Sequence, residues 1–139
     1  MIKDSGERTA FDTGAVRDMH IGKGRMDLLP WYGIISVSQL CEEGAIKYGE
    51  RNVDRGIPLH SLLDSASRHL AKYIMGEDDE DHLRAACWNL LWALQQRTTH
   101  PELNDMPWGE QERKEGEARR AMKELCEIVL YNNANADGS

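Results

Sequence analysis

The feature that most constrains the fold is a segment near the middle of the chain that is apolar on almost every side of a helix. It begins within the acidic stretch EDDEDH and runs to about Gln96. Its apolar residues recur every three or four positions, which is the spacing of an α-helix. They are Leu83, Ala86, Cys87, Leu90, Leu91 and Leu94. A helix that is apolar almost all round has to be enclosed by other elements, so we expect it to be the central helix of the fold.

Three other segments have helical spacing, and the sequence therefore predicts an all-α fold, a bundle of four to five helices. The first follows Pro30 and ends at Gly49, the second covers His60 to Met75, and the last runs from about Gln111 to Tyr131. Glycine is common just past the end of a helix, which places two of these ends at Gly49 and Gly76. No segment alternates between apolar and polar residues as a strand would.

The 139 residues suffice for one domain with its own core. We expect a polar N-terminal arm over residues 1–24, a helical domain that carries the site over residues 25–132, and a disordered polar tail over residues 133–139. The arm is polar and punctuated by glycine, which is typical of a loop that becomes ordered only when something binds it.

The charge of the chain argues against nucleic acid as a partner. Seventeen Lys and Arg residues against 24 Asp and Glu residues give a formal net charge of −7. Binding to DNA or RNA independently of sequence depends on basic side chains that neutralise phosphates. A small phosphorylated ligand is still compatible with this charge, because metal ions can bridge an acidic protein and an anion.

Neither a membrane nor an oxidising compartment is indicated. No stretch approaches the ~20 apolar residues of a membrane span, and Met1 is not followed by the pattern of a signal peptide. The three cysteines, Cys41, Cys87 and Cys126, are odd in number and lack CxxC spacing. Each lies in an apolar helical pattern, so we expect three reduced, packed thiols and a cytoplasmic location.

Acidic residues gather at three places on helices that should pack together. They are Glu42 and Glu43 on the first helix, Asp64 on the second, and the run from Glu77 to Asp81 before the third. Carboxylates that meet in a partly buried site repel one another unless cations lie between them. Mg²⁺ and Mn²⁺ suit such a site because both prefer oxygen ligands.

Basic residues lie one or two turns from these acids. Lys47 follows Glu43 by four residues, and Arg68 and Lys72 follow Asp64 by four and eight. A metal–polyphosphate site needs both kinds of residue, carboxylates for the metal and Lys or Arg for the phosphate oxygens. The simpler interpretation is also open: these are the i,i+4 ion pairs of a solvated helix, and the acidic run complements the dipole of the helix it precedes.

Individual polar and aromatic residues allow two interpretations each. Asn89 lies inside AACWNLLWAL and must find hydrogen-bond partners, either on a substrate or on a neighbouring helix. His82 has no second histidine at a metal-ligand spacing, so a capping or core hydrogen-bonding role is the ordinary expectation. Four tryptophans should belong to the core or an interface, and one of them could stack on a nucleobase: Trp31, Trp88, Trp92 and Trp108.

Five segments, in order, resemble a known enzyme family. They are SGERTAFDTGAVRD, GKGRMDLLP, EEGAIKYGERN, GIPLHSLLDSASRHLAKY and GEDDEDHLRAACWN, which together cover roughly residues 5–96. This order resembles the phage-encoded dATP/dGTP diphosphohydrolases, a family similar to the MazG-like all-α nucleoside triphosphate pyrophosphohydrolases. Its MazZ members serve bacteriophages that replace adenine by diaminopurine.

The resemblance implies an oligomeric hydrolase that converts dGTP or dATP to the monophosphate and pyrophosphate with two or three Mg²⁺ or Mn²⁺ ions. The residues at the family's metal-ligand positions are Glu42, Glu43, Asp64, Glu80 and Asp81. Those at its substrate positions are Lys47, Arg68, His69, Lys72 and Asn89, with Lys23 and Arg25 of GKGR closing over the substrate. Glu43, Lys47 and Asp81 would act in catalysis, and Glu80 or Asp81 could be a base instead of a ligand.

The sequence departs from the family pattern at two places. Val53 follows the Arg-Asn pair where the family often has tryptophan, which puts a packing or stacking role there in doubt. Ile46 stands three residues after Glu43, where the MazG-like pattern has another acid, so the ligand set cannot be transferred whole. The acids before the third helix could supply the missing ligand.

Two rival functions remain open at this stage. An HD-type phosphohydrolase needs a His-Asp pair, and this chain has only the reverse order, Asp81-His82. A helical interaction module, or one that binds a nucleotide without cleaving it, would also fit the polar arm and the apolar helix. The apolar helix and four tryptophans also suggest more hydrophobic surface than a monomer covers, so we expect a homodimer or homotetramer.

Overall fold

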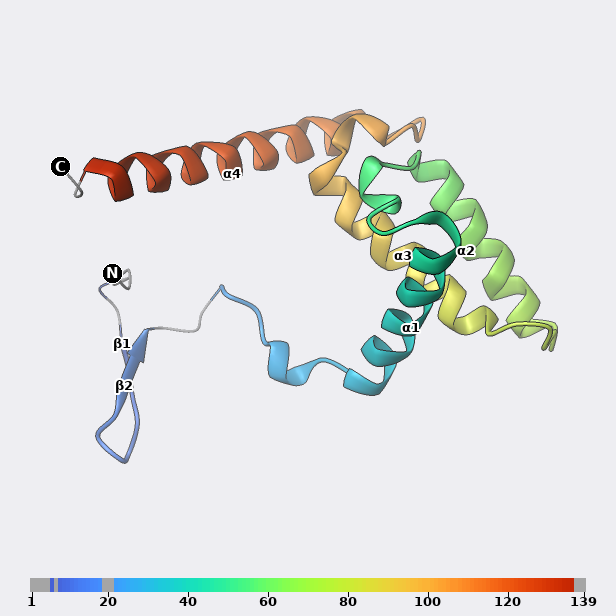
Figure 1. Ribbon diagram of the computed structural model, residues 1–139, viewed down its shortest axis with the longest axis horizontal. Helices are drawn as coiled ribbons and strands as arrows, with labels where there is room; N and C mark the ends of the chain where they lie inside the picture. Colours follow the sequence, from blue (N-terminus) through green and yellow to red (C-terminus); the bar gives the residue numbers. More distant parts are fainter. Residues whose placement is uncertain (1–5, 7, 19–21, 137–139) are drawn as a thin grey trace. The chain divides into compact units, whose positions relative to one another are not determined.

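The computed structural model describes residues 6, 8–18 and 22–136, with side chains described as far as Ile128 in the last helix. The chain divides into two compact units, residues 1–31 and residues 32–139. Each unit is described by itself. Together they contain the helices and the small sheet that are labelled in Figure 1.

The first unit contains a β-hairpin, which the sequence analysis did not predict. Strands β1 (Arg8–Ala10) and β2 (Val16–Asp18) are antiparallel, with Thr9 opposite Arg17. The amide of Phe11 donates to Ala15 O (2.9 Å), and the amide of Gly14 donates to Phe11 O (2.8 Å). Gly14 has a φ of 83°, a conformation that favours glycine. Strands of three residues are too short to show a clear alternation, which is why the pattern missed them.

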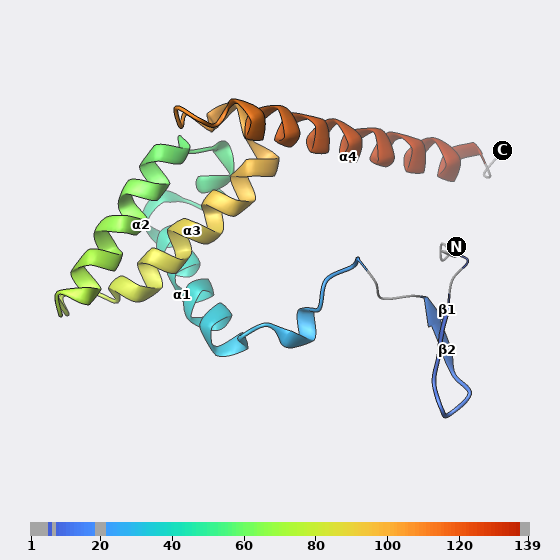
Figure 2. The ribbon, with the colours of Figure 1, turned by 180° about the vertical axis from the view of Figure 1, so that it is seen from behind.

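Among the described residues, the second unit contains four α-helices and two 3-10 turns, and the predicted all-α fold is confirmed. The helices are α1 (Trp31–Tyr48, whose first residue belongs to the first unit), α2 (Leu59–Ile74), α3 (His82–Thr99) and α4 (Glu110–Ala136). The turns are η2 (Val53–Arg55) and η3 (Pro101–Leu103), and a further turn, η1 (Met26–Leu28), lies in the first unit. Figures 1 and 2 show α2 and α3 side by side and running in opposite directions.

The core lies where α2 packs on α3. Leu59 and Leu62 of α2 and Ala93 of α3 are its buried centre. Five partly buried apolar residues pack against them: Ile57, Leu63, Trp88, Trp92 and Met106. The large aromatic surfaces of the two tryptophans therefore extend a core whose fully buried side chains are few.

The buried side of α3 differs from the expectation. Its buried residues are small or polar: His82, Ala85, Ala86, Asn89, Ala93 and Gln96. The leucines that the sequence pattern placed in the core are instead exposed, Leu83 by 42%, Leu90 by 48% and Leu94 by 59%. Small residues let α2 approach closely, so the large side chains of α3 occupy the other sides of the helix.

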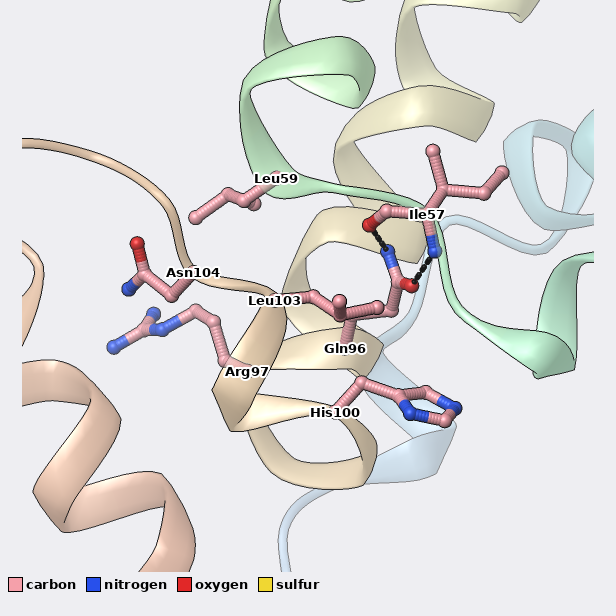
Figure 3. Close-up of a pocket in the computed structure, with 7 residues that line it drawn as sticks. All are labelled: Ile57, Leu59, Gln96, Arg97, His100, Leu103 and Asn104. Carbon is pink, nitrogen blue, oxygen red and sulfur yellow. Dashed lines mark hydrogen bonds between the residues drawn. The ribbon is translucent and has the colours of Figure 1, made fainter.

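A buried glutamine holds the segment before α2 against α3 (Figure 3). Gln96 is 3% exposed, and its amide nitrogen donates to Ile57 O at 2.9 Å. Its amide oxygen accepts from the backbone N–H of Ile57. The side-chain amide thus pairs with a peptide group as a neighbouring strand would, and both buried polar groups are satisfied.

The start of α2 is capped from a distant part of the chain. Pro58 precedes the helix and offers no side-chain acceptor for its free N–H groups. The carboxylate of Asp105 accepts from the backbone N–H of His60 (2.9 Å) and also contacts the His60 ring. These hydrogen bonds lower the pKa of Asp105. The loop after η3 therefore fixes where α2 begins.

Helix α4 crosses the end of α3 at a glycine. A Cβ atom on Gly116 would collide with the carbonyl oxygen of Arg97 and with Pro101, so only glycine allows this approach. The helix runs to Ala136, beyond the end at about Tyr131 that the sequence predicts. Of the expected disordered tail, residues 137–139 lie outside the described residues. Its apolar residues Met122 and Leu125 are 66% and 62% exposed.

The structure bears on two further expectations, one about a membrane span and one about the packing of the cysteines. None of the described helices combines the length and hydropathy that crossing a bilayer requires. The three cysteines are unpaired but exposed, so the expectation that they are packed was wrong. They lie on α1, α3 and α4, outside the buried core that α2 and α3 form.

The pairing of Gln96 with Ile57 predicts a measurable loss of stability. Replacing Gln96 by leucine leaves the buried N–H and C=O of Ile57 without partners, so the free energy of unfolding should fall by about 1–3 kcal/mol. Chemical denaturation followed by circular dichroism measures the change. Gln95→Leu, at the neighbouring exposed position, should stay within about 0.5 kcal/mol of the parent. Equal stability of the two variants would show that the amide pairing contributes nothing.

Candidate functional site

A cleft of the second unit lies between α1, the segment that follows it, and the α2–α3 pair. Its volume is about 780 Å³, within the usual range for small-molecule sites. Apolar and aromatic residues form much of its wall, including Leu40, Val53, Ile57, Trp88 and Trp92. Polar residues line the rest: Glu50, Arg51, Asn52, Asp54, His69, Glu80 and Asn89.

Arg84 connects the two sides of the cleft at one end. This residue of α3 donates to Ser36 Oγ of α1 (3.1 Å) and forms an ion pair with Glu43 of α1 (3.4 Å). Its guanidinium also lies 3.3 Å from the carboxylate of Asp81, whose other oxygen caps the Arg84 amide (3.0 Å). The arginine side chain is 23% exposed. It therefore holds α1 and α3 together and brings Glu43 and Asp81 near one another.

The loop after α1 forms the mouth of the cleft. Gly49 has a φ of 92° and ends α1, and Arg51 has a φ of 60°, which is rare for a residue other than glycine. The Arg51 guanidinium lies 3.5 Å from Asp54 and is 86% exposed. A strained backbone at a cleft mouth is a common sign of function, and it presents both charges of this pair to the solvent at the opening.

Two histidines and a carboxylate meet on the wall of the cleft. Nδ1 of His69 on α2 lies 3.1 Å from Nδ1 of His82 on α3. Oε1 of Glu80 lies 3.5 Å from each of these nitrogens. The side chain of His82 is fully buried, that of His69 is 18% exposed, and that of Glu80 is 53% exposed. His69 and Glu80 line the cleft itself.

Asp79 holds the second nitrogen of the buried histidine. Its carboxylate lies 2.7 Å from His82 Nε2, and this hydrogen bond lowers the pKa of Asp79. A carboxylate only accepts, so Nε2 carries the proton and donates it. In the neutral imidazole, Nδ1 then has a free lone pair that faces His69 and Glu80.

The five predicted metal ligands lie in four separate places. Glu80 lines the cleft, and Glu43 and Asp81 share Arg84. Asp64 forms an ion pair with Arg68 on the exposed surface of α2, and Glu42 is exposed on α1. Among the described residues, no three of these five carboxylates offer ligand atoms within 4.8 Å of one another. Their assignment as ligands stays a prediction.

The predicted phosphate-binding residues are similarly dispersed. Of Lys47, Arg68, His69 and Lys72, all in the described part of the chain, His69 lines the cleft. Lys72 pairs with Glu77 (3.4 Å), and Arg68 pairs with Asp64. Lys47 lies over the ring of Tyr48, 5.0 Å from its centre. Contact with Tyr48, and the charge of Glu80, raise the pKa of Lys47.

Lys23 and Arg25 belong to the first unit. Arg25 forms two hydrogen bonds with Asp27, at 2.8 and 2.6 Å, and both side chains are exposed. This ion pair raises the pKa of Arg25. The proposed closure of these residues over a substrate stays a prediction.

Asn89 and Trp88 give the deep wall of the cleft its polar groups. The Asn89 amide is 7% exposed and donates to Ala85 O within its own helix (2.8 Å), so it does not join two helices. The indole N–H of Trp88 is buried and has no acceptor among the described residues. A ligand in the cleft could therefore supply an acceptor that the protein leaves missing.

Three functional candidates were missed from the sequence: Arg51, Asn52 and His82. The first two stand in the quoted segment YGERN, but nothing in their spacing linked them to the helices. His82 was judged to lack a second histidine, and His69 supplies it from the facing helix. The signal was present, because His69 and His82 lie seven and six residues on either side of Gly76, where the chain reverses between α2 and α3.

Comparison with known proteins gives one match. Residues 13–106 match the profile of the family described as dATP/dGTP diphosphohydrolase, N-terminal. This range contains every residue that lines the cleft and ends before α4. No curated protein and no solved structure matches the chain.

Asp81 caps α3 and is also a predicted metal ligand or base, and two substitutions test its role as the cap. Asp81→Ala removes the cap on α3 and should lower the free energy of unfolding by about 1 kcal/mol, whereas Asp81→Asn keeps an acceptor at the cap and should cost far less. Denaturation curves of both variants measure this. If alanine is as well tolerated as asparagine, the capping bond to Arg84 does not contribute to stability.

Proposed function

We propose a catalytic function from one premise: the chain belongs to the dATP/dGTP diphosphohydrolase family. The proposed reaction is hydrolysis of dGTP or dATP to the monophosphate and pyrophosphate, assisted by Mg²⁺ or Mn²⁺. The observation that carries this proposal is the cleft, because its whole lining falls within the family-matched residues and combines an aromatic wall with an acidic rim.

The aromatic wall fits a purine base. Trp88 and Trp92 lie with ring centres 6.0 Å apart and tilted by 53°, and both line the cleft. Bases stack on such side chains, and each stacked base contributes about 1–3 kcal/mol. The unpartnered N–H of Trp88 would donate to a ring nitrogen or carbonyl oxygen of the base.

The acidic rim fits hard divalent ions. Glu80 lines the cleft, whereas Glu43 of α1 and Asp81, the cap of α3, lie outside its lining and are joined by Arg84. The side chains of Glu43, Glu80 and Asp81 are 64%, 53% and 50% exposed, so their oxygens are open to solvent and to ions. Mg²⁺ takes one or two carboxylates together with substrate phosphates and retains waters, which suits such an open donor set. Asp64 and Glu42 would have to change their present contacts or positions to join it.

The residues of the chain would then act on the α–β anhydride as follows. When bound, the ions supply Lewis acidity and lower the pKa of a water molecule. Lys47, and Arg68 and Lys72 if they leave their carboxylate partners, would offset charge on the phosphate oxygens. Glu80 or Asp81 would take the proton of the water as its oxygen bonds to phosphorus. The bridging P–O bond breaks, and pyrophosphate leaves with that electron pair.

The biological setting is part of the same proposal. Such a reaction in the cytoplasm of a bacterial host would change the pool of purine deoxynucleotides available to a bacteriophage. The formal charge of −7 supports a substrate other than DNA or RNA, because the chain lacks a basic excess.

A non-catalytic nucleotide-binding function is the second candidate. The observation in its favour is the separation of the five predicted ligand carboxylates among the described residues. A binding module needs only the aromatic wall and a few charges, and it has no need of a shared metal cluster. Product analysis distinguishes the two functions directly.

We also propose that the chain associates with itself as a homodimer or homotetramer. Four leucines of α3 are exposed, and three of them, Leu83, Leu90 and Leu94, recur at helical spacing along one stripe. A second copy is the occupant that fits, because an apolar stripe on a helix pairs readily with the same stripe across a two-fold axis.

Leu90→Glu tests this self-association. A buried leucine contributes about 1.5–3 kcal/mol, so the dissociation constant should rise roughly tenfold or more. Light scattering over a concentration series measures the mass of the particle. Gln95→Glu, on another exposed side of α3, should leave it unchanged. A parent protein that is monomeric at every concentration would refute the proposal.

The catalytic proposal is tested with a panel of nucleoside triphosphates. The chain should convert dGTP or dATP to monophosphate and pyrophosphate with Mg²⁺ or Mn²⁺, and chelator should abolish the reaction. Chromatography identifies the products. Glu80→Gln and Asp81→Asn should lower kcat by about 10²–10⁴-fold, the usual contribution of a positioned acid or base.

Asp78→Asn is the matched control for these variants. Asp78 belongs to the same acidic run and is exposed, but it is not one of the five predicted metal ligands. Its substitution should leave kcat unchanged. Binding of dGTP, seen as a rise in melting temperature, without any monophosphate would support the non-catalytic function instead.

A further inference from the structure

We propose that His69, Glu80 and His82 form a site for one first-row divalent transition ion, with Zn²⁺ as the reference case. This site shares Glu80 with the carboxylate site of the proposed hydrolysis and differs from it in its other two ligands, which are imidazoles. The residues come from the second half of α2, the segment before α3, and the first position of α3. The reversal of the chain at Gly76 brings them together.

The positions of the three ligand atoms fit a small ion. The two Nδ1 atoms are 3.1 Å apart, and Glu80 Oε1 lies 3.5 Å from each. Ligand atoms about 2.0–2.1 Å from a tetrahedral Zn²⁺ are about 3.3–3.4 Å from one another. A point about 2 Å from all three atoms therefore exists, and it is the length of a Zn–N or Zn–O bond.

Asp79 prepares His82 as a ligand. Its hydrogen bond to Nε2 (2.7 Å) keeps the proton on that nitrogen and leaves the lone pair of Nδ1 facing the other two ligand atoms. Ligating histidines usually donate their second N–H to a carboxylate in this way, which fixes the ring and makes it a stronger ligand. The buried position of His82 allows little rotation of the ring.

The neighbouring acidic group is a weaker candidate. Glu77, Asp79 and His82 also offer three ligand atoms within 4.8 Å. In that group, however, Lys72 already pairs with Glu77 (3.4 Å), and His82 Nε2 is occupied by Asp79. The lone pair of His82 Nδ1 faces the other side, where His69 and Glu80 lie.

A hydrogen bond between the two imidazoles does not explain the whole arrangement. It accounts for the 3.1 Å between His69 and His82. It gives Glu80 no role, because 3.5 Å is beyond the usual length of a hydrogen bond. A shared cation would hold all three groups.

The ligand types select the class of ion. Imidazole nitrogen suits zinc, iron, copper and nickel, whereas Mg²⁺ prefers oxygen ligands and retains water. Three protein ligands on a four-coordinate ion leave one position open. Since His69 and Glu80 line the cleft, that position is accessible to an oxygen atom of a ligand in the cleft.

The experiment measures metal uptake by the chelator-treated full chain without any nucleotide, so its result does not depend on the proposed hydrolysis. Equilibrium dialysis should show one tightly bound Zn²⁺ per chain, which a large excess of Mg²⁺ does not displace. Co²⁺ in its place should give the strong visible absorption of a four-coordinate ion. Asp79→Asn should weaken binding by about 10–100-fold, the usual effect of losing a ligand-orienting carboxylate.

The decisive variant is His69→Gln, because this side chain is partly exposed and its loss leaves the buried His82 in place. It should weaken Zn²⁺ binding more than Asp79→Asn does, while its melting temperature in chelator stays near that of the parent. His60→Gln, an exposed histidine on the same helix, should bind Zn²⁺ as the parent does. Unchanged affinity in His69→Gln, or equal losses in His69→Gln and His60→Gln, would overturn the proposal.

Discussion

The contact between α2 and α3 is the interaction on which the rest of the second unit depends. The buried residues of α3 are small or polar, among them Ala86, Asn89 and Ala93, and Ala93 packs with Leu59 and Leu62 of α2 in the core. Small side chains allow the two helices to approach closely, and the polar ones find partners at both ends of the contact. Gln96 satisfies Ile57 at one end, and Asp79 satisfies His82 at the other.

This contact has two consequences for the site. It places His69 opposite His82, across the reversal of the chain at Gly76, and Trp88 and Trp92 line the cleft beside α1. Helix α1 reaches α3 mainly through polar bonds of Arg84, with Ser36 and Glu43, so the space between them is a cleft instead of a packed core. The family-matched residues cover this entire arrangement.

The same contact explains why the leucines of α3 are exposed. A helix that is apolar on almost every side can bury only part of its surface against one partner, and the small residues occupy that part here. Leu83, Leu90 and Leu94 are left facing solvent within the chain as described. The expectation that they fill a monomer core was wrong, although the same residues remain suited to an interface with another copy. The apolar pattern alone does not say which molecule covers it.

The sequence by itself determined the helices, because helical spacing and glycine positions depend on neighbours a few residues away. Tyr48–Gly49 and Met75–Gly76 end α1 and α2 as expected, and the all-α class followed from the same local rules. The sequence also contains the five segments that resemble the family. The hairpin β1–β2 was too short to be recognised, and the grouping of charges could not be read at all. Only the tertiary structure decided that Glu43 and Asp81 share Arg84, that Asp64 stays with Arg68, and that two histidines thirteen residues apart meet beside Glu80. Those groupings depend on how closely the helices approach and how each is rotated about its axis, and the side chains between them set both.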